Sequence, residues 1–355
     1  MSLFLQDISG GLIFIIVFAC LFVLAAIGLF LIAKRIRGLV FNKRYDDNHT
    51  LKYFYASDFE NLEAEPIEFI SKKNKIKGLI YKNTTFDSYK GVIVFAHGLG
   101  AGHVQYTTEI NHFAKNGYIV VSYDISGTGN SEGKTIKGVT TGLYNLIDCL
   151  KFVENNPSLS IYKKMVIGHS LGGYAVNNVT RFNSNLVGVV SLSGFDAPYK
   201  LISEEIGLAN GTEISALRFM FKLLDLFNFG KDGVLSSLDA FKKTEINHLI
   251  IAGDKDNIVD TIKNFEMFRD VLKEKNNFEF VLVNDRYHRP NITVDAANYD
   301  QETNVQLADL KRDFNNKVPE ERLKKYYESL DYNLLVQLDD EVMNKIDEFI
   351  ERCFQ

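Results

Sequence analysis

The chain has 355 residues, which is long enough for a sizeable core, and its composition is that of an ordinary globular protein. A net charge of −5 and a pI near 5.9 give no electrostatic basis for binding nucleic acid. The three cysteines, Cys20, Cys149 and Cys353, lie far apart without a CxxC pair, so they predict neither a zinc site nor a disulfide framework.

A short N-terminal tail, residues 1–10, precedes an uncharged and almost wholly apolar run at residues 11–33. At about 1.5 Å per residue this run would span roughly 34 Å as a helix, enough to cross a ~30 Å hydrocarbon core. A cleaved signal peptide would carry positive charge before the run, whereas here only Asp7 precedes it and basic residues follow it. We therefore expect one uncleaved transmembrane helix in a lipid bilayer.

Basic residues gather directly after the apolar run: Lys34, Arg35, Arg37, Lys43 and Arg44. Basic residues favour the cytoplasmic side, so we expect a single-pass protein of the cell membrane with its N-terminus outside and its remaining chain in the cytosol. The cluster either contacts anionic lipid headgroups or acts only as a topology signal. Residues 34–65 are expected to form a basic juxtamembrane connector.

From residue 66 to residue 355 the chain alternates short apolar runs with helical patterns. Residues 67–70 and 76–81 are typical of two antiparallel strands joined by a Lys-Lys-Asn turn. Further apolar runs follow at 92–96, 119–123, 165–167, 187–192, 249–252 and 278–283. Residues 143–153 space their apolar side chains by three and four, as one face of a helix does. The alternation predicts a parallel sheet covered by helices on both faces, with ligands at the carboxyl ends of its strands.

A glycine-rich loop follows each of the apolar runs at 92–96 and 119–123. Gly98, Gly100 and Gly102 allow backbone N–H groups to turn toward a ligand. The loop at 127–135 resembles nucleotide-binding motifs, but Thr128 and Glu132 stand where a P-loop and a dinucleotide fingerprint need glycine. We expect no nucleotide site.

The run at 165–167 ends in the sequence Gly168-His169-Ser170-Leu171-Gly172, and a helical pattern follows. This is the form of a nucleophile elbow, a strained strand-to-helix turn that lifts a serine hydroxyl into a pocket. Gly168 and Gly172 must be glycine, because a Cβ at either position would collide with the neighbouring strand or helix. A hydroxyl is a poor nucleophile at neutral pH, so Ser170 needs a general base.

His288 is the histidine best placed to act as that base. Triad order on this architecture is serine, then acid, then histidine, which leaves His248 and His288. His248 begins a strand, at the wrong end for catalysis, whereas His288 closely follows one. For the acid, Asp254 and Asp256 compete after the run at 249–252; Asp256 lies further out and is favoured. Asp196 is a weaker alternative, and Asp285 is expected to be a solvated loop residue.

These motifs together resemble the α/β-hydrolases, specifically the branch of monoacylglycerol lipases, lysophospholipases and serine-aminopeptidase-like hydrolases. The resemblance implies a mostly parallel eight-stranded sheet with helices on both faces. It also implies Ser170 as nucleophile, Asp256 as orienting acid and His288 as base. The backbone N–H groups of Leu99 and Leu171 would form the oxyanion hole, where each donor is typically worth ~10²–10³ in rate. No metal or cofactor is implied.

Two regions depart from the family pattern. Residues 198–244 form an insertion rich in Leu, Met and Phe, which is typical of a helical cap over the pocket. The cap either forms an acyl-chain wall or a face that contacts the bilayer, or it packs only on its own domain. After His288 the chain runs on for 67 residues. Residues 342–350 space five apolar side chains as an amphipathic helix after Asp339 and Asp340, which can cap it. Residues 291–335 are charged and tyrosine-rich without an evident function.

We therefore predict a membrane-anchored serine hydrolase that cleaves carboxylic, lipid-like esters. A peptidase acting on short peptides would share every catalytic residue and differ only in its pocket. A non-catalytic binding protein on the same fold is the third hypothesis, because fold does not decide function.

Overall fold

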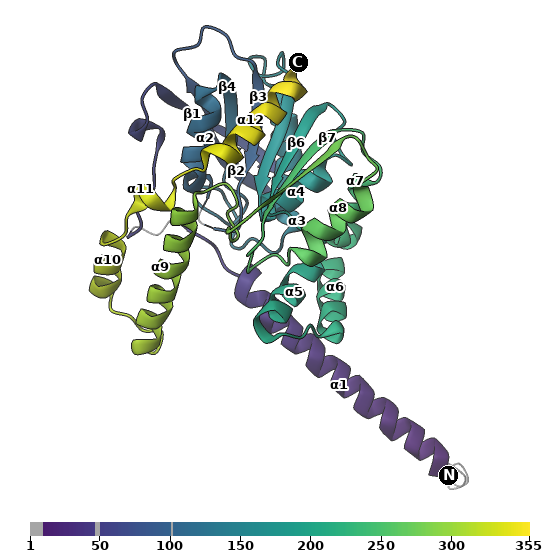
Figure 1. The fold of residues 1–355 in the computed structure, drawn as a ribbon. Helices are drawn as coiled ribbons and strands as arrows, with labels where there is room; N and C mark the ends of the chain where they lie inside the picture. Colours follow the sequence, from purple (N-terminus) through teal and green to yellow (C-terminus); the bar gives the residue numbers. More distant parts are fainter. Residues whose placement is uncertain (1–9, 47–49, 101) are drawn as a thin grey trace.

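The computed structural model describes residues 10–46, 50–100 and 102–355, so the predicted N-terminal tail lies outside the described residues except for Gly10. A single eight-stranded sheet in the order β1-β2-β4-β3-β5-β6-β7-β8 forms its centre (Figure 1). The strands are β1 (Leu62–Ser71), β2 (Asn74–Asn83), β3 (Gly91–Ala96), β4 (Tyr118–Tyr123), β5 (Lys164–His169), β6 (Leu186–Leu192), β7 (Asn247–Gly253) and β8 (Phe278–Val283). β2 pairs antiparallel with β1 and β4, and every other pairing is parallel.

The predicted hairpin is confirmed, with β1 and β2 joined across Lys72 and Lys73. β1 nevertheless begins at Leu62, four residues before the predicted start of the domain at residue 66, so the predicted connector is that much shorter. Pro66 lies inside β1 rather than before it. A proline, which lacks an N–H donor, is tolerated here because β1 is the edge strand of the sheet.

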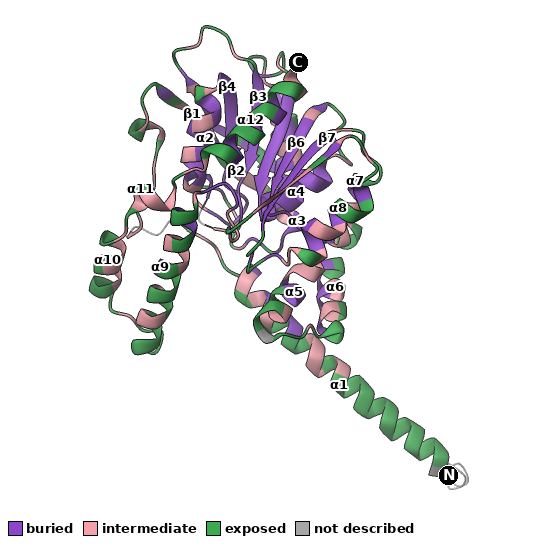
Figure 2. Cartoon of the chain, viewed as in Figure 1, coloured by how far each residue is buried: buried purple, intermediate pink, exposed green. Residues whose placement is uncertain are grey.

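Helices cover both faces of the sheet, as expected. α3 (Thr140–Asn155) and α4 (Leu171–Val179) pack on one face, and α2 (Thr107–Lys115) and α12 (Asp340–Phe354) pack on the other. The central strands β3 to β7 are almost continuously buried (Figure 2). α12 follows the predicted pattern, because its five apolar residues, Val342, Met343, Ile346, Phe349 and Ile350, are all buried. Asp339 caps it by accepting a 3.0 Å hydrogen bond from the Val342 amide.

α1 (Gly10–Phe41) is one helix that is long and apolar enough to cross a membrane. Its first two-thirds project away from the sheet and expose apolar side chains (Figures 1 and 2). The helix does not end where the apolar run ends, so the predicted connector begins as helix. Ala33, Arg37 and Phe41 follow one another at a spacing of four, share one face and are buried. The domain therefore stabilises the end of α1 by packing.

The insertion after β6 is helical and comprises α5 (Pro198–Asn210), α6 (Ser215–Phe229) and α7 (Ser237–Phe241). α8 (Met267–Leu272) packs beside β7 and β8. The charged stretch after His288 contains α9 (Val294–Asp313), α10 (Glu320–Glu328) and α11 (Tyr332–Leu335). α9 and α10 lie side by side, joined by a 2.6 Å hydrogen bond from the Tyr326 hydroxyl to the Thr303 carbonyl (Figure 1). Short 3₁₀ segments (Ala56–Asp58, His103–Tyr106, Gly230–Val234) and a π-helical turn (Ile262–Glu266) complete the described elements.

Candidate active site

Ser170 occupies the sharp turn between β5 and α4. Its backbone has φ 55° and ψ −114°, in the positive-φ region that residues other than glycine rarely adopt. A Cβ on Gly168 would collide with the backbone of Gly172, and one on Gly172 would collide with the Ala96 carbonyl. The turn therefore has the geometry that its sequence predicts, with α4 starting immediately after the serine.

Asp256 and His288 meet at the carboxyl ends of β7 and β8. The Nδ1–H group of His288 donates to the Asp256 carboxylate, at 2.9 Å and 3.0 Å from its two oxygens. Asp256 also accepts 2.9 Å hydrogen bonds from the amides of Ile258 and Val259. Burial alone would raise the pKa of Asp256, but the His288 ring and the two amides outweigh burial and hold that pKa below its usual value. With Nδ1 protonated, Nε2 of a neutral His288 is an acceptor.

The other candidate acids have partners elsewhere in the structure. Asp254 accepts from the Arg286 amide at 3.2 Å and so ties together the two loops that carry Asp256 and His288. Asp196 lies in the loop between β6 and the cap, where it accepts from the Ser236 hydroxyl and the Lys200 ammonium group of the cap, both at 2.6 Å. Asp285 is exposed and pairs with Lys255, as expected of a solvated loop residue.

Ser170 and His288 line one pocket of about 280 Å³. In this structure, which describes both residues, the Ser170 and His288 side chains are not hydrogen-bonded to each other. Hydrogen bonds between a catalytic serine and its base commonly tighten only when substrate is bound. The other lining residues are mostly apolar. They come from α1 and the segment after it, the loops after β3, β4 and β7, the end of β5, α4 and α5: Val40, Phe41, Lys43, Tyr45, Leu99, Tyr106, Val139, His169, Leu171, Leu201, Ile202, Glu205 and Ile258.

Leu99 and Leu171 place two backbone amides at this pocket. Leu171 is the first residue of α4, so its N–H group has no acceptor within the helix and lies at the positive end of the helix dipole. Leu99 follows β3, in the loop that runs beside the serine turn. The arrangement can therefore present two donors to an anionic oxygen.

His169, for which the sequence predicts no role, links the two sides of the pocket. Its Nε2–H group donates to the His288 carbonyl at 2.8 Å, so Nδ1 is the acceptor of a 2.8 Å hydrogen bond from the Tyr106 hydroxyl. That hydroxyl in turn accepts from the Gly98 amide at 3.2 Å. Burial lowers the pKa of His169 to about 3, so the ring stays neutral and keeps this pattern of donors. The only sequence signal for this role of His169 is its position inside the Gly-x-Ser-x-Gly motif.

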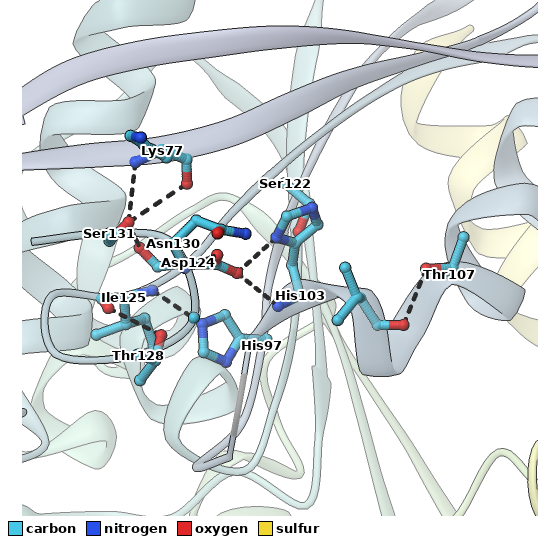
Figure 3. A network of polar contacts seen from close by, with 12 residues as sticks. Lys77, His97, His103, Thr107, Ser122, Asp124, Ile125, Thr128, Asn130 and Ser131 are labelled. Carbon is cyan, nitrogen blue, oxygen red and sulfur yellow. Dashed lines mark hydrogen bonds and ion pairs between the residues drawn. The ribbon is translucent and has the colours of Figure 1, made fainter. Parts of the chain in front are cut away.

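A second buried network, centred on Asp124, supports the Leu99 loop (Figure 3). Asp124 accepts from the backbone amide and from Nδ1 of His103, at 3.0 Å and 2.7 Å. Burial alone would raise the pKa of Asp124, but the His103 ring outweighs burial and lowers that pKa to about 2. His97 accepts from the Ile125 amide at 2.9 Å and donates to the Gly98 carbonyl at 2.6 Å. The start of the loop is thus anchored to the end of β4.

The loop at 127–135, which resembles nucleotide motifs, instead holds the chain that follows α1. The Arg44 side chain donates to the carbonyls of Ser131 and Gly133, at 2.8 Å and 2.9 Å. The Tyr45 amide donates to the Gly127 carbonyl at 3.0 Å. These contacts attach the segment after α1 to the body of the domain.

Comparisons with known proteins agree with this architecture. The model of a family described as serine aminopeptidase, S33, matches residues 87–208. An esterase of Pyrococcus furiosus, Pf2001, superposes with a TM-score of 0.54 at 18% identity, covering 76% of this chain and 98% of its own. Another crystal form of that esterase gives 0.53 at 17% identity, covering 76% and 97%. A comparison with curated proteins found no match.

The superposition on the esterase covers about three quarters of this chain, and at 18% identity it shows a shared fold. The chain therefore has the α/β-hydrolase fold.

Proposed function

We propose that this protein is a serine hydrolase that cleaves carboxylic esters through an acyl-enzyme on Ser170. The observation that carries the proposal is the shared pocket of Ser170 and His288, with His288 held by the buried Asp256 carboxylate. The esterase described in the name of the structural relative supports the choice of ester over other acyl substrates.

In this mechanism the Ser170 oxygen attacks the ester carbonyl while Nε2 of His288 accepts the hydroxyl proton. The carbonyl π electrons move to the oxygen, and the amides of Leu99 and Leu171 donate to the resulting anion. Collapse of the tetrahedral intermediate breaks the bond to the alcohol, which leaves with the proton from His288. Water, deprotonated by His288, then attacks the acyl-enzyme and releases the carboxylic acid and Ser170. Asp256 keeps the imidazole in the required tautomer throughout.

The proposal includes the location of the enzyme. α1 would anchor it in the cell membrane with the N-terminus outside, because basic residues follow the apolar run rather than precede it. The pocket would then face the cytosolic leaflet. Protease added to intact cells should leave the folded domain undigested, and digestion of that domain would show that the orientation is reversed.

A peptidase is the second candidate, and one feature of the pocket favours it. The carboxylate-bearing residue Glu205 lines the pocket together with His288. A carboxylate there could pair with the ammonium group of a peptide N-terminus. The description of the matching family model, a serine aminopeptidase, supports the same candidate.

The two candidates separate on chromogenic substrates with a common reporter. We expect the full chain in detergent micelles to hydrolyse short p-nitrophenyl esters and to leave aminoacyl p-nitroanilides intact. Ser170→Ala should lower the ester rate about 10⁴-fold or more, while Ser160→Ala, at an exposed serine, should match the wild type. Hydrolysis of the anilides alone would favour the peptidase, and ester hydrolysis that survives Ser170→Ala would refute the mechanism.

A further inference from the structure

The last turn of α1 reaches the candidate active site. Val40 and Phe41 line the pocket that contains Ser170 and His288. Tyr45, which also lines it, donates from its hydroxyl to the Val40 carbonyl at 2.9 Å and so caps the end of the helix. The Gly129 amide donates to the Tyr45 carbonyl at 2.9 Å. The end of the apolar helix is thus built into the pocket wall rather than tethered to it.

α1 is also fixed to the cap helix α6. The Arg37 guanidinium group donates to one Asp225 oxygen from Nε and Nη2, at 3.0 Å and 2.8 Å, and both side chains are about 6% exposed. Below this ion pair, Phe30 packs edge-on against Phe227, with ring centroids 6.4 Å apart. Phe30 belongs to the apolar run, so α6 reaches the level at which the predicted membrane span ends.

The distance along α1 sets the height of the pocket above the bilayer. Val40 lies seven residues after Ala33, the last residue of the apolar run, which is roughly 10 Å along a helix. Each headgroup layer is roughly 5–8 Å thick. If α1 spans the bilayer, the pocket wall therefore lies just outside the headgroup layer of the leaflet in which the apolar run ends.

Apolar side chains of the cap are exposed on α6 and just before it. Phe219 is 56% exposed and Phe227 is 79% exposed on α6, and Ile214 is 49% exposed just before it. Figure 2 shows α6 beside α1, where α1 leaves the domain. Lys34 and Arg35, exposed on α1 at this height, suit anionic headgroups. The continuity of this surface with α1 identifies the bilayer as its occupant.

From these contacts we propose that the last turn of α1 is a specificity-determining wall of the substrate pocket, and that the enzyme takes acyl esters dissolved in the bilayer across the α1–α6 surface. The inference rests on the proposed ester hydrolysis at Ser170. Anchor and pocket then form one unit, and esters that partition into the leaflet are the substrates that this unit selects.

The experiment uses the full chain reconstituted into vesicles of phosphatidylcholine and phosphatidylglycerol, with 4-methylumbelliferyl oleate and acetate as substrates. The two esters share a leaving group, so the ratio of their kcat/KM values isolates the effect of the chain. Val40→Trp places bulk in the pocket wall, and its matched control is Leu39→Trp, whose side chain is 68% exposed on another face of α1. We expect Val40→Trp to lower the oleate-to-acetate ratio roughly tenfold or more and Leu39→Trp to leave it at the wild-type value.

The bilayer surface is tested in the same vesicles. The double variant Phe219→Glu/Phe227→Glu puts two carboxylates against the lipid, and Ile161→Glu is the control at a 76% exposed position outside α1 and the cap. We expect the double variant to lower the ratio roughly tenfold, because a charge at the apolar boundary is costly, and the control to leave it unchanged.

Each outcome decides a separate point. An unchanged oleate-to-acetate ratio in Val40→Trp would show that the last turn of α1 does not determine specificity. An unchanged ratio in the double variant would show that esters do not enter across the α1–α6 surface. A wild type that cleaves acetate but not oleate would overturn the inference while ester hydrolysis stands. A wild type that cleaves neither ester would contradict the proposed function itself.

Discussion

Ser170 and His169 are neighbours whose side chains have different tasks in the structure. The strained turn directs the serine into the pocket, while the histidine ring bridges the His288 carbonyl and the Tyr106 hydroxyl. Through Tyr106 the contact reaches the Gly98 amide, one residue before Leu99. His169 thereby couples the loop that carries the proposed base to the loop that carries a proposed oxyanion donor. We regard it as a positioning residue, because it acts through His288 and Gly98.

Removing the His169 ring should impair positioning without removing a reacting group. We expect His169→Ala to lower kcat for a p-nitrophenyl ester by about 10–10²-fold with a smaller change in KM, because displacement of a base by about 1 Å costs this much. His112→Ala, on α2 and paired with Asp347, is the matched control. An unaltered kcat in His169→Ala, or an equal loss in the control, would contradict the assigned role.

The choice between Asp254 and Asp256 shows what residue-level reasoning can reach. Both follow the same strand by one and three residues, so spacing alone permitted either as the acid. The structure brings Asp256 to His288 and assigns Asp254 to the Arg286 amide of the His288 loop. Which carboxylate faces the imidazole depends on the loop after β8, which no local pattern describes.

At the scale of elements, the strands and the main helices were predictable because their apolar spacing follows the sheet and helix periods. The continuation of α1 through Phe41 was not, because Ala33, Arg37 and Phe41 form a buried face only when α6 is beside them. The sequence places Arg37 among five basic residues that follow the apolar run, whereas the structure buries it against Asp225. Composition cannot distinguish a headgroup contact from a buried ion pair.

The buried ion pair between Arg37 of α1 and Asp225 of α6 stabilises the contact between these two helices. Burial raises the pKa of Asp225 to about 6, and the Arg37 charge opposes that rise. We expect Arg37→Met to lower the free energy of unfolding by about 3–5 kcal/mol, because it leaves a buried carboxyl group unpaired. The double variant Arg37→Met/Asp225→Leu should recover most of that loss. Thermal unfolding of the wild type, Arg37→Met, Asp225→Leu and the double variant in one detergent measures the cycle, and additive losses of the two single variants would show that the two side chains are not coupled.

At the scale of the whole molecule, three buried histidines make stability depend on pH. Burial lowers the pKa of His97 and of His248 to about 4 and that of His169 to about 3. Unfolding exposes these rings and restores values near 6.5. The unfolded state therefore binds more protons between about pH 4 and 6.5, so stability is full above pH 6.5 and falls as the pH drops toward 4.

His248 isolates this effect because it lies away from the pocket, stacked on Phe278 with its Nδ1–H group donating to the Ile246 carbonyl. Each such histidine contributes a slope of up to about 1.4 kcal/mol per pH unit. His248→Gln removes one titrating ring, so its melting temperature should fall less between pH 7.5 and pH 5 than that of the wild type. Circular dichroism measures both melting temperatures. An equal fall of the melting temperature in the two proteins would contradict this account.

The central claim is that the fold activates Ser170 through His288, and labelling with a fluorophosphonate probe in isolated membranes tests it most directly. The probe reacts with activated serines, so the wild type should be labelled and Ser170→Ala should not. His288→Ala should be labelled far more slowly, since the serine keeps its turn but loses its base. A folded wild type that resists the probe, or labelling that persists in Ser170→Ala, would contradict the assignment of Ser170 as the nucleophile.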